Sequence, residues 1–253
     1  MLKLPTLTLA TFTALIIISP DAVRAAAINN GDFATGDFSG WTTTGQATVQ
    51  DGQAVLETCY FESLGGGCNE DIRLTNDDGL PIDYEWLHEF LPALPNNLNI
   101  KEGSAIKQEI MANAGDTLTF SWNFLTNEEP SVDYNDFAFF TVGNSFEILA
   151  NTESGNLNSD PLSGFNKSTG YQTRTYTIPT TGPYTLGFGV VDVGPDDLGF
   201  YINSALRVDN VQIKSPDAVP EPSTILGTLT AIGFGIKLKR RRANKENKDE
   251  NCD

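Results

Sequence analysis

The sequence contains few of the residues that carry most catalytic and nucleic-acid-binding chemistry. Its 253 residues include one histidine, three cysteines and three tryptophans, and only 16 basic residues stand against 33 acidic ones. No HExxH, P-loop or GxGxxG pattern occurs. A Ser-His-Asp site would have to use His88, which has no nucleophile motif beside it and is therefore interpreted as a surface or packing histidine.

The amino terminus has the pattern of a secretory signal peptide. Lys3 precedes an apolar run over residues 7–18, and Pro20 and three alanines at 25–27 follow it. We expect cleavage after Ala27, so that residues 1–27 are removed. An uncleaved N-terminal anchor is the alternative, although the run is short for a membrane span.

The carboxyl terminus combines an apolar stretch, residues 223–236, with a basic cluster. At about 1.5 Å per residue this stretch makes a helix of about 21 Å, against a hydrocarbon thickness of about 30 Å, so the span is marginal. Basic residues beside a membrane segment stay on the cytoplasmic side, which leaves the preceding chain outside. The cluster that acts as a membrane stop consists of Lys237, Lys239, Arg240, Arg241 and Arg242.

This carboxyl terminus resembles the PEP-CTERM sorting signal of bacterial exported proteins. The resemblance rests on residues 219–242, in which the apolar stretch and the arginines follow a motif formed by Val219, Pro220, Glu221 and Pro222. It implies cleavage near that motif by an exosortase-type membrane protease and delivery to the cell surface or to extracellular polysaccharide. Residues 243–253 would form a polar cytoplasmic tail. A permanently anchored single-span surface protein is the alternative.

The segment that remains outside, residues 28–218, is strongly acidic. Between residues 28 and 219 there are 27 acidic and seven basic residues, a net charge of −20. A negative field of this size repels phosphate backbones, which excludes nucleic acid as a partner. It suits divalent cations, and solubility outside the cell is the simpler explanation of the same charge.

Alternation of apolar and polar residues predicts an all-β fold for this segment. We expect an antiparallel β-sandwich of jelly-roll type, built from about nine short strands separated by Gly, Asn and Pro. A helical insertion is expected between Pro81 and Pro92, because Trp86 and Phe90 have helical spacing there. The strands are expected at residues 47–50, 53–58, 106–112, 117–124, 137–142, 146–150, 171–178, 184–193 and 205–213. Asp51-Gly52, between the first two, accepts positive φ and predicts a tight hairpin.

Two of the three cysteines fall close together in the exported segment. Cys59 and Cys68 flank a glycine-rich loop, and an oxidising compartment favours a disulfide between them. A metal pair is the competing use, but further Cys or His ligands are scarce. Cys252 would lie unpaired on the cytoplasmic side.

The two ends of the exported segment resemble galactose-binding-like jelly rolls, including the family 4 carbohydrate-binding modules. The resemblance rests on Asn30-Gly31-Asp32-Phe33 with the GDFSGW stretch at 36–41, and on Val208-Asp209-Asn210-Val211. It implies that the first and last strands lie side by side and that a structural calcium ion sits against them. Asp32 and Asp209 are the ligands that this resemblance suggests.

Further acidic residues gather on two stretches of the middle of the chain. Glu128, Asp133 and Asp136 are close in sequence, and Asp192 precedes two more aspartates at 196 and 197. Such groups suit oxygen ligation of calcium, although neither follows the EF-hand pattern. Solvated loop charge is the alternative.

These observations favour a non-catalytic exported surface or extracellular-matrix protein that binds carbohydrate. Sugar rings pack on exposed aromatic faces, and of the three tryptophans we expect Trp41 and Trp122 in the core and Trp86 as the available platform. The alternative is a secreted glycoside hydrolase that uses two carboxylates.

Overall fold

The computed structural model describes residues 27–58, 82–96, 98–131, 133–159, 164–194 and 203–216. Within these residues, no helix is both long enough and apolar enough to cross a bilayer. The expected signal peptide, the Cys59–Cys68 pair and the sorting segment lie outside the described residues.

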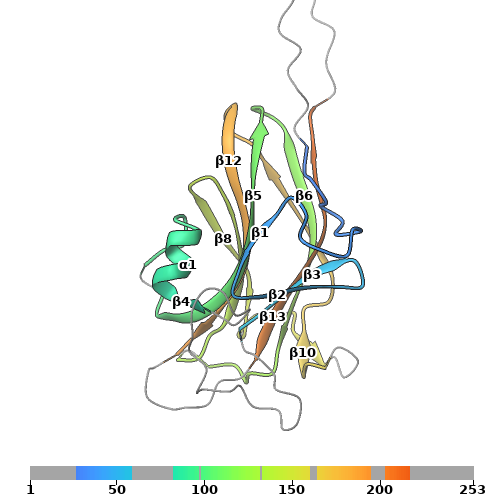
Figure 1. Ribbon diagram of the computed structural model, residues 1–253. Helices are drawn as coiled ribbons and strands as arrows, with labels where there is room; N and C mark the ends of the chain where they lie inside the picture. The colour runs from blue at the N-terminus through green and yellow to red at the C-terminus, as the bar shows by residue number, and fades with distance from the viewer. Residues whose placement is uncertain are drawn as a thin grey trace, which may run out of the picture. The chain divides into compact units, whose positions relative to one another are not determined.

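The first of two antiparallel sheets is built around the long strands β5 and β12, which pair along most of their length. Its path is β1-β5-β12-β7-β8, and β4 pairs with β5 beside it. Figure 1 shows this sheet next to the helix α1. Its strands are β1 (Thr42–Thr44), β4 (Ile82–Asp83), β5 (Ile100–Ala112), β7 (Phe137–Val142), β8 (Ser145–Asn151) and β12 (Gly182–Val193).

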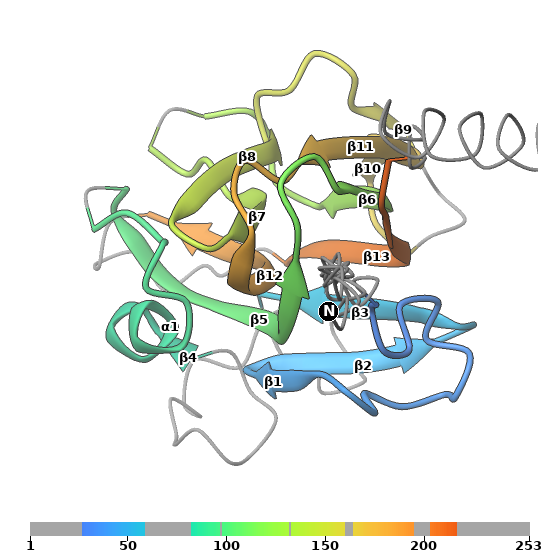
Figure 2. The ribbon, with the colours of Figure 1, turned by 90° about the horizontal axis from the view of Figure 1, so that it is seen from above.

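The second sheet is built around β6 and β13 and faces the first, so the chain folds as an antiparallel β-sandwich. Its path is β2-β3-β13-β6-β10-β9, with β11 also paired to β6. The two layers are seen from above in Figure 2. The strands are β2 (Gln46–Gln50), β3 (Gln53–Glu57), β6 (Thr117–Thr126), β9 (Asn158–Ser159), β10 (Lys167–Ser168), β11 (Gln172–Thr177) and β13 (Ser204–Lys214).

The core lies between the sheets and follows directly from the alternation in the sequence. On β6, every second side chain from Leu118 to Phe124 is buried inward, and Thr117, Thr119 and Ser121 alternate with them. The two sheets meet through aromatic rings: Phe120 and Phe188 pack edge to face with centroids 4.8 Å apart.

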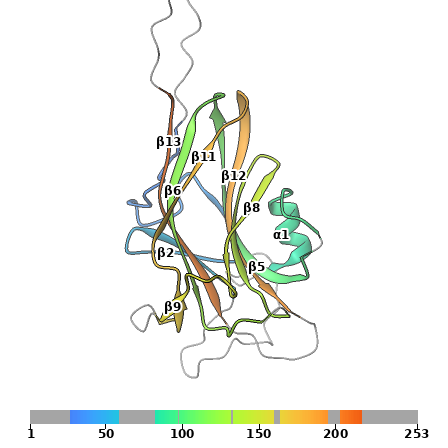
Figure 3. The same ribbon diagram turned by 180° about the vertical axis from the view of Figure 1, so that it is seen from behind.

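One helix, α1 (Tyr84–Phe90), covers part of the outer face of the first sheet. Figure 3 shows it on the side of β5 and β8, away from β6 and β13. Leu87 and Leu91 are its buried contacts. Glycines make room for them: a Cβ on Gly187 would lie 2.5 Å from Leu91, and one on Gly103 would lie 3.1 Å from Leu87. The helical insertion expected near Trp86 and Phe90 is therefore confirmed.

The hairpin expected at Asp51-Gly52 is also confirmed. Both residues have positive φ, 51° and 73°, which is the conformation of a two-residue turn between twisted strands. The described residues form 13 strands where about nine were expected, because β1, β4, β9 and β10 are two or three residues long and carry no readable alternation.

The opening segment differs from the expectation of a first strand. Asn30 and Phe33 take left-handed φ values of 49° and 48°, and Phe33 N–H donates to Asn30 O at 3.3 Å, so the segment forms turns. It still lies against the last strand, because Val211 N–H donates to Gly31 O at 2.8 Å. The resemblance therefore placed the two ends side by side correctly and was wrong about the strand.

Candidate functional site

Three carboxylates gather at one end of the sandwich. Glu128 follows β6, Asp136 precedes β7 and Asp192 is the penultimate residue of β12. Each continues the inward-facing alternation of its strand, after Phe124 and Thr126 on β6, and before Ala138 on β7. The cluster therefore combines one carboxylate from the second sheet with two from the first, at the end of the space between them.

The three side chains are close together and almost completely buried. Each has a carboxylate oxygen within 4.8 Å of one on each of the others. The exposed fractions are 4% for Glu128, 0% for Asp136 and 8% for Asp192. Asp136 Oδ1 accepts a hydrogen bond of 3.0 Å from Val193 N–H, whereas Asp136 Oδ2 and Glu128 Oε2 are buried without any hydrogen-bond partner. Buried acceptors without partners are rare and costly.

The electrostatics of the cluster oppose ionisation. Burial, followed by the charge of Asp192, raises the pKa of Glu128 to about 8. Burial and the charges of Asp192 and Glu128 raise the pKa of Asp136 well above its usual value, and the Ser204 hydroxyl opposes this only in part. The cluster therefore holds its negative charges only at a cost, unless a cation enters between them.

Hydroxyl groups and a backbone contact hold the β6 end of the cluster. Thr126 Oγ1 accepts a 3.0 Å hydrogen bond from Glu128 N–H and lies 2.9 Å from Ser204 Oγ. Lys167 Nζ donates to the backbone oxygen of Glu128 at 3.2 Å and forms an ion pair with Glu129 at 2.8 Å. Lys167 therefore neutralises the charge of Glu129, which is exposed beside the cluster.

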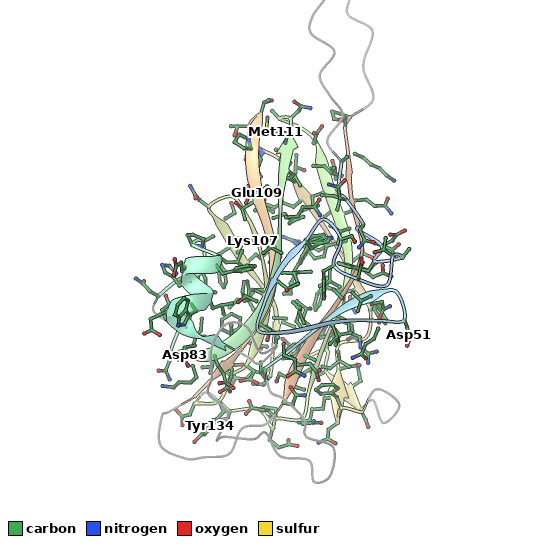
Figure 4. The ribbon with its side chains drawn as sticks, in the orientation of Figure 1. Asp51, Asp83, Lys107, Glu109, Met111 and Tyr134 are labelled. Carbon is green, nitrogen blue, oxygen red and sulfur yellow. The ribbon has the colours of Figure 1, made fainter. Side chains whose placement is uncertain are left out.

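The other acidic residues suggested as metal ligands lie elsewhere. Asp133 is exposed on the connection between β6 and β7, which Tyr134 marks in Figure 4. Asp32 is exposed and accepts a hydrogen bond from Ala34 N–H. Asp209 lies near it, since burial and then the Asp32 charge raise the pKa of Asp209. Neither Asp32 nor Asp209 joins the buried cluster.

A groove with a volume of about 330 Å³ lies on the outer face of the first sheet. The segment that follows α1 forms one wall, strands β5, β7 and β12 contribute side chains, and the turn between β7 and β8 completes it. Glu109, on β5, is labelled in Figure 4 between Lys107 and Met111. The lining consists of Leu91, Pro92, Ala93, Glu109, Thr141, Gly143, Asn144, Pro183 and Thr185.

The groove combines apolar surface with a few hydrogen-bonding groups. Thr185 Oγ1 donates to Glu109 Oε1 at 2.6 Å, which holds the carboxylate in place. Thr141 Oγ1 is buried without a hydrogen-bond partner, and Asn144 is an exposed amide. Leu91, Pro92 and Pro183 supply the apolar contacts. Such a mixture suits a small polyhydroxylated ligand.

The aromatic residues and the histidine take the places expected from the sequence. Trp41 and Trp122 are core residues, 8% and 7% exposed, and Trp86 on α1 is 51% exposed. Trp86 does not line the groove. His88 Nδ1 lies 2.8 Å from Leu94 O and its ring stacks on Tyr84, which is a packing role.

The sequence analysis missed the groove and the hydroxyls that support the cluster. Glu109, Thr141 and Thr185 come from three strands and carry no common motif, so no local pattern could identify them. Thr126 was detectable, because it continues the alternation Leu118, Phe120 and onward as the first polar inward residue.

No protein-family model and no curated protein matches this chain. Solved structures that resemble it include TmCBM61 in complex with beta-1,4-galactotriose (TM-score 0.34, 11% identity, 74% of this chain and 96% of that one). Another is the N-terminal cellulose-binding domain of Cellulomonas fimi beta-1,4-glucanase C (TM-score 0.31, 13% identity, 76% of this chain and 98% of that one). A third is a beta-glucosidase from Kluyveromyces marxianus in complex with glucose (TM-score 0.26, 11% identity, 68% of this chain and 17% of that one). All three TM-scores are below 0.5, and the function proposed below therefore rests on the geometry of this chain.

Proposed function

We propose that this protein is a non-catalytic, exported β-sandwich protein that binds extracellular carbohydrate in the groove beside α1. The observation that carries the proposal is the groove itself, in which a fixed carboxylate and an exposed amide border an apolar surface. Carboxylates and amides bind sugar hydroxyls, and the apolar residues contact the C–H faces of the ring. The volume of about 330 Å³ is at the small end of ligand sites, which suits one or two sugar units.

The same groove argues against hydrolysis. A glycoside hydrolase places two carboxylates on either side of the scissile bond, about 5 to 9.5 Å apart. Glu109 is the one acidic residue among those that line the groove. The three carboxylates of the buried cluster are each at most 8% exposed, so a sugar chain has no access to them.

Binding to a glycan array tests this function on residues 28–218, which contain every described strand. We expect saturable binding that Glu109→Gln and Asn144→Ala each weaken by about tenfold, the loss of one charge-assisted or one neutral hydrogen bond. Glu89→Gln is the matched control, because Glu89 is exposed on α1 and outside the groove lining. Equal affinities for Glu109→Gln and wild type would refute the groove as the site.

The proposal includes the route out of the cell. The sequence pattern of residues 219–242 supports recognition of Val219, Pro220, Glu221 and Pro222 by an exosortase-type protease, with the apolar stretch as a temporary membrane anchor. Replacing Pro220 and Pro222 by alanine lets a helix continue through the motif, so the precursor should accumulate in the membrane at full length. If peptide mapping shows that wild-type protein from its native host retains Arg240 to Arg242, the sorting proposal is wrong and the segment is a permanent single-span anchor.

A further inference from the structure

The buried cluster of Glu128, Asp136 and Asp192 is unrelated to the groove and needs its own explanation. It lies between the sheets, whereas the groove lies on the outer face of the first sheet. Its residues replace apolar ones at positions where each strand would otherwise continue the core. Three neighbouring buried acids destabilise a fold unless protons or a cation compensate them.

We propose that Glu128, Asp136 and Asp192 bind a calcium ion that ties the two sheets together at this end of the sandwich. Two independent observations converge on this site. Oxygens of all three carboxylates lie within 4.8 Å of one another, which is the spacing of ligands around one ion. In addition, Glu128 Oε2 and Asp136 Oδ2 are buried with no hydrogen-bond partner, so each has an unused acceptor.

The donor set selects the class of metal. All three side chains offer carboxylate oxygens, which bind hard cations, and His88, the histidine of the described residues, does not belong to the cluster. Calcium accepts flexible geometry with oxygens at about 2.3 to 2.6 Å, whereas magnesium demands a near-ideal octahedron and retains its waters. A buried site assembled from three separate chain segments therefore favours calcium.

The position of the site indicates how a bound ion would act on the fold. Glu128 and Asp136 are the two ends of the connection that leads from the second sheet to the first. An ion held by both residues and by Asp192 on β12 closes this connection onto the first sheet. Because the unfolded chain lacks the assembled site, binding stabilises the folded state.

The test uses the full-length chain, stripped with chelator and then titrated with calcium. We expect calcium to bind with one-to-one stoichiometry by calorimetry, and to raise the melting temperature by about 5 °C or more at millimolar concentration. Magnesium at the same concentration should raise it less. An equal or larger rise with magnesium would overturn the assignment to calcium, and no rise with either ion would overturn the site.

Matched amide variants locate the ion. Glu128→Gln and Asp136→Asn should each weaken calcium binding by at least about tenfold, because carboxylate number sets affinity. In chelator both should melt at or above the wild-type temperature, since each amide replaces a buried carboxyl group that becomes an uncompensated charge once it loses its proton. Asp209→Asn, outside the cluster, should retain the full response. A response that is lost in Asp209→Asn and retained in Glu128→Gln would place the ion elsewhere.

The outcome is independent of the proposed carbohydrate function. Glu109→Gln changes the groove and leaves the cluster intact, so it should respond to calcium as the wild type does. A protein that binds calcium and no glycan would refute the groove alone, and one that binds glycan without a calcium response would refute the ion site alone.

Discussion

Two acidic regions of this molecule look alike in the sequence and differ completely in the fold. Glu128, Asp136 and Asp192 are buried between the sheets, and two of their oxygens have no partner. Asp32 and Asp209 lie near the two ends of the β-sandwich segment, where local groups already satisfy them: Asp209 Oδ2 accepts from Asn210 Nδ2 at 2.8 Å, and Asp32 Oδ1 accepts from Ala34 N–H.

The difference shows that charge alone does not define a cation site. Asp32 is exposed and Asp209 is partly exposed, so this pair of carboxylates is largely hydrated and screened and gains little by holding an ion. A buried group of three has lost its water, and its mutual repulsion persists at low dielectric. The buried group therefore requires compensation by protons or by a cation, and the pair of Asp32 and Asp209 does not.

The largest expected effect is on the pH dependence of stability without calcium. The pKa of Glu128 is raised from 4.5 to about 8, so the folded state holds a proton that the unfolded state releases above about pH 4.5. The stabilisation that this proton provides is complete below the pKa of Glu128 in the unfolded chain. It is lost as the pH rises through the pKa of Glu128 in the folded protein. In chelator, the melting temperature should fall between pH 5 and pH 8.5; calcium should abolish most of this fall.

Thermal scans in chelator across this range check the prediction, with Glu128→Gln as the control that flattens the curve. The groups that face Glu128 are Asp136 from β7 and Asp192 from β12, and Lys167 contacts only its backbone oxygen. A melting temperature that climbs steadily from pH 5 to pH 8.5 in chelator would contradict the comparison of the two regions.

A smaller effect is expected from the hydroxyl that supports the cluster. Thr126→Val keeps the shape of a fully buried side chain but removes the acceptor of Glu128 N–H and the partner of Ser204 Oγ. We expect a loss of about 1 to 3 kcal/mol in the free energy of unfolding, measured by urea denaturation. Thr119→Val, at a partly exposed position on the same strand, is the control and should change little. Equal losses in both variants would mean that the hydroxyl has no special role.

The exposed ion pair beside the cluster should matter less. Lys167→Met removes the pair with Glu129, whose side chain is 84% exposed, and the contact with the Glu128 backbone. Exposed pairs contribute about 0 to 1 kcal/mol, so we expect a loss in that range by the same urea measurement. A loss above 2 kcal/mol would show that Lys167, and not a bound cation, compensates the buried charges.

The smallest effect belongs to the second acidic region. Asp32→Asn should change the free energy of unfolding by no more than about 0.5 kcal/mol, because Asp32 is exposed. The calcium-induced rise in melting temperature should persist unchanged. If this variant abolished the calcium response, the calcium ion would lie beside Asp32 and Asp209, as the family resemblance suggests.

Much of the fold could be predicted from the sequence because its signals are local. The alternation on β6 and the Asp51-Gly52 turn act over a few residues, and the structure has both. The opening segment failed as a strand because the left-handed conformations of Asn30 and Phe33 are imposed by packing against β13, where Phe33 is fully buried. The shortest strands were missed because their pairing comes from distant partners, as β1 with β5.

The candidate sites show the same division. Local acidity suggested Glu128, Asp136 and Asp192 together with Asp133, and the family resemblance suggested Asp32 and Asp209. Nothing in the sequence separated the first three from the rest. Their meeting depends on the register of β7 with β12, whose last pair, Phe137 with Val191, places Asp136 beside Asp192. The groove had no local signal, since the segment after α1, three strands and the turn between β7 and β8 contribute to it.

The sequence by itself determined the all-β class and the helical insertion, because composition and short-range periodicity require no knowledge of contacts. From charge and terminal patterns it also gave the expectations of export and of no nucleic-acid partner. Only the tertiary structure decided which acids are buried together and where a ligand could enter. Burial, and with it the raised pKa of Glu128, is a property of residues that are distant in the chain and adjacent in space.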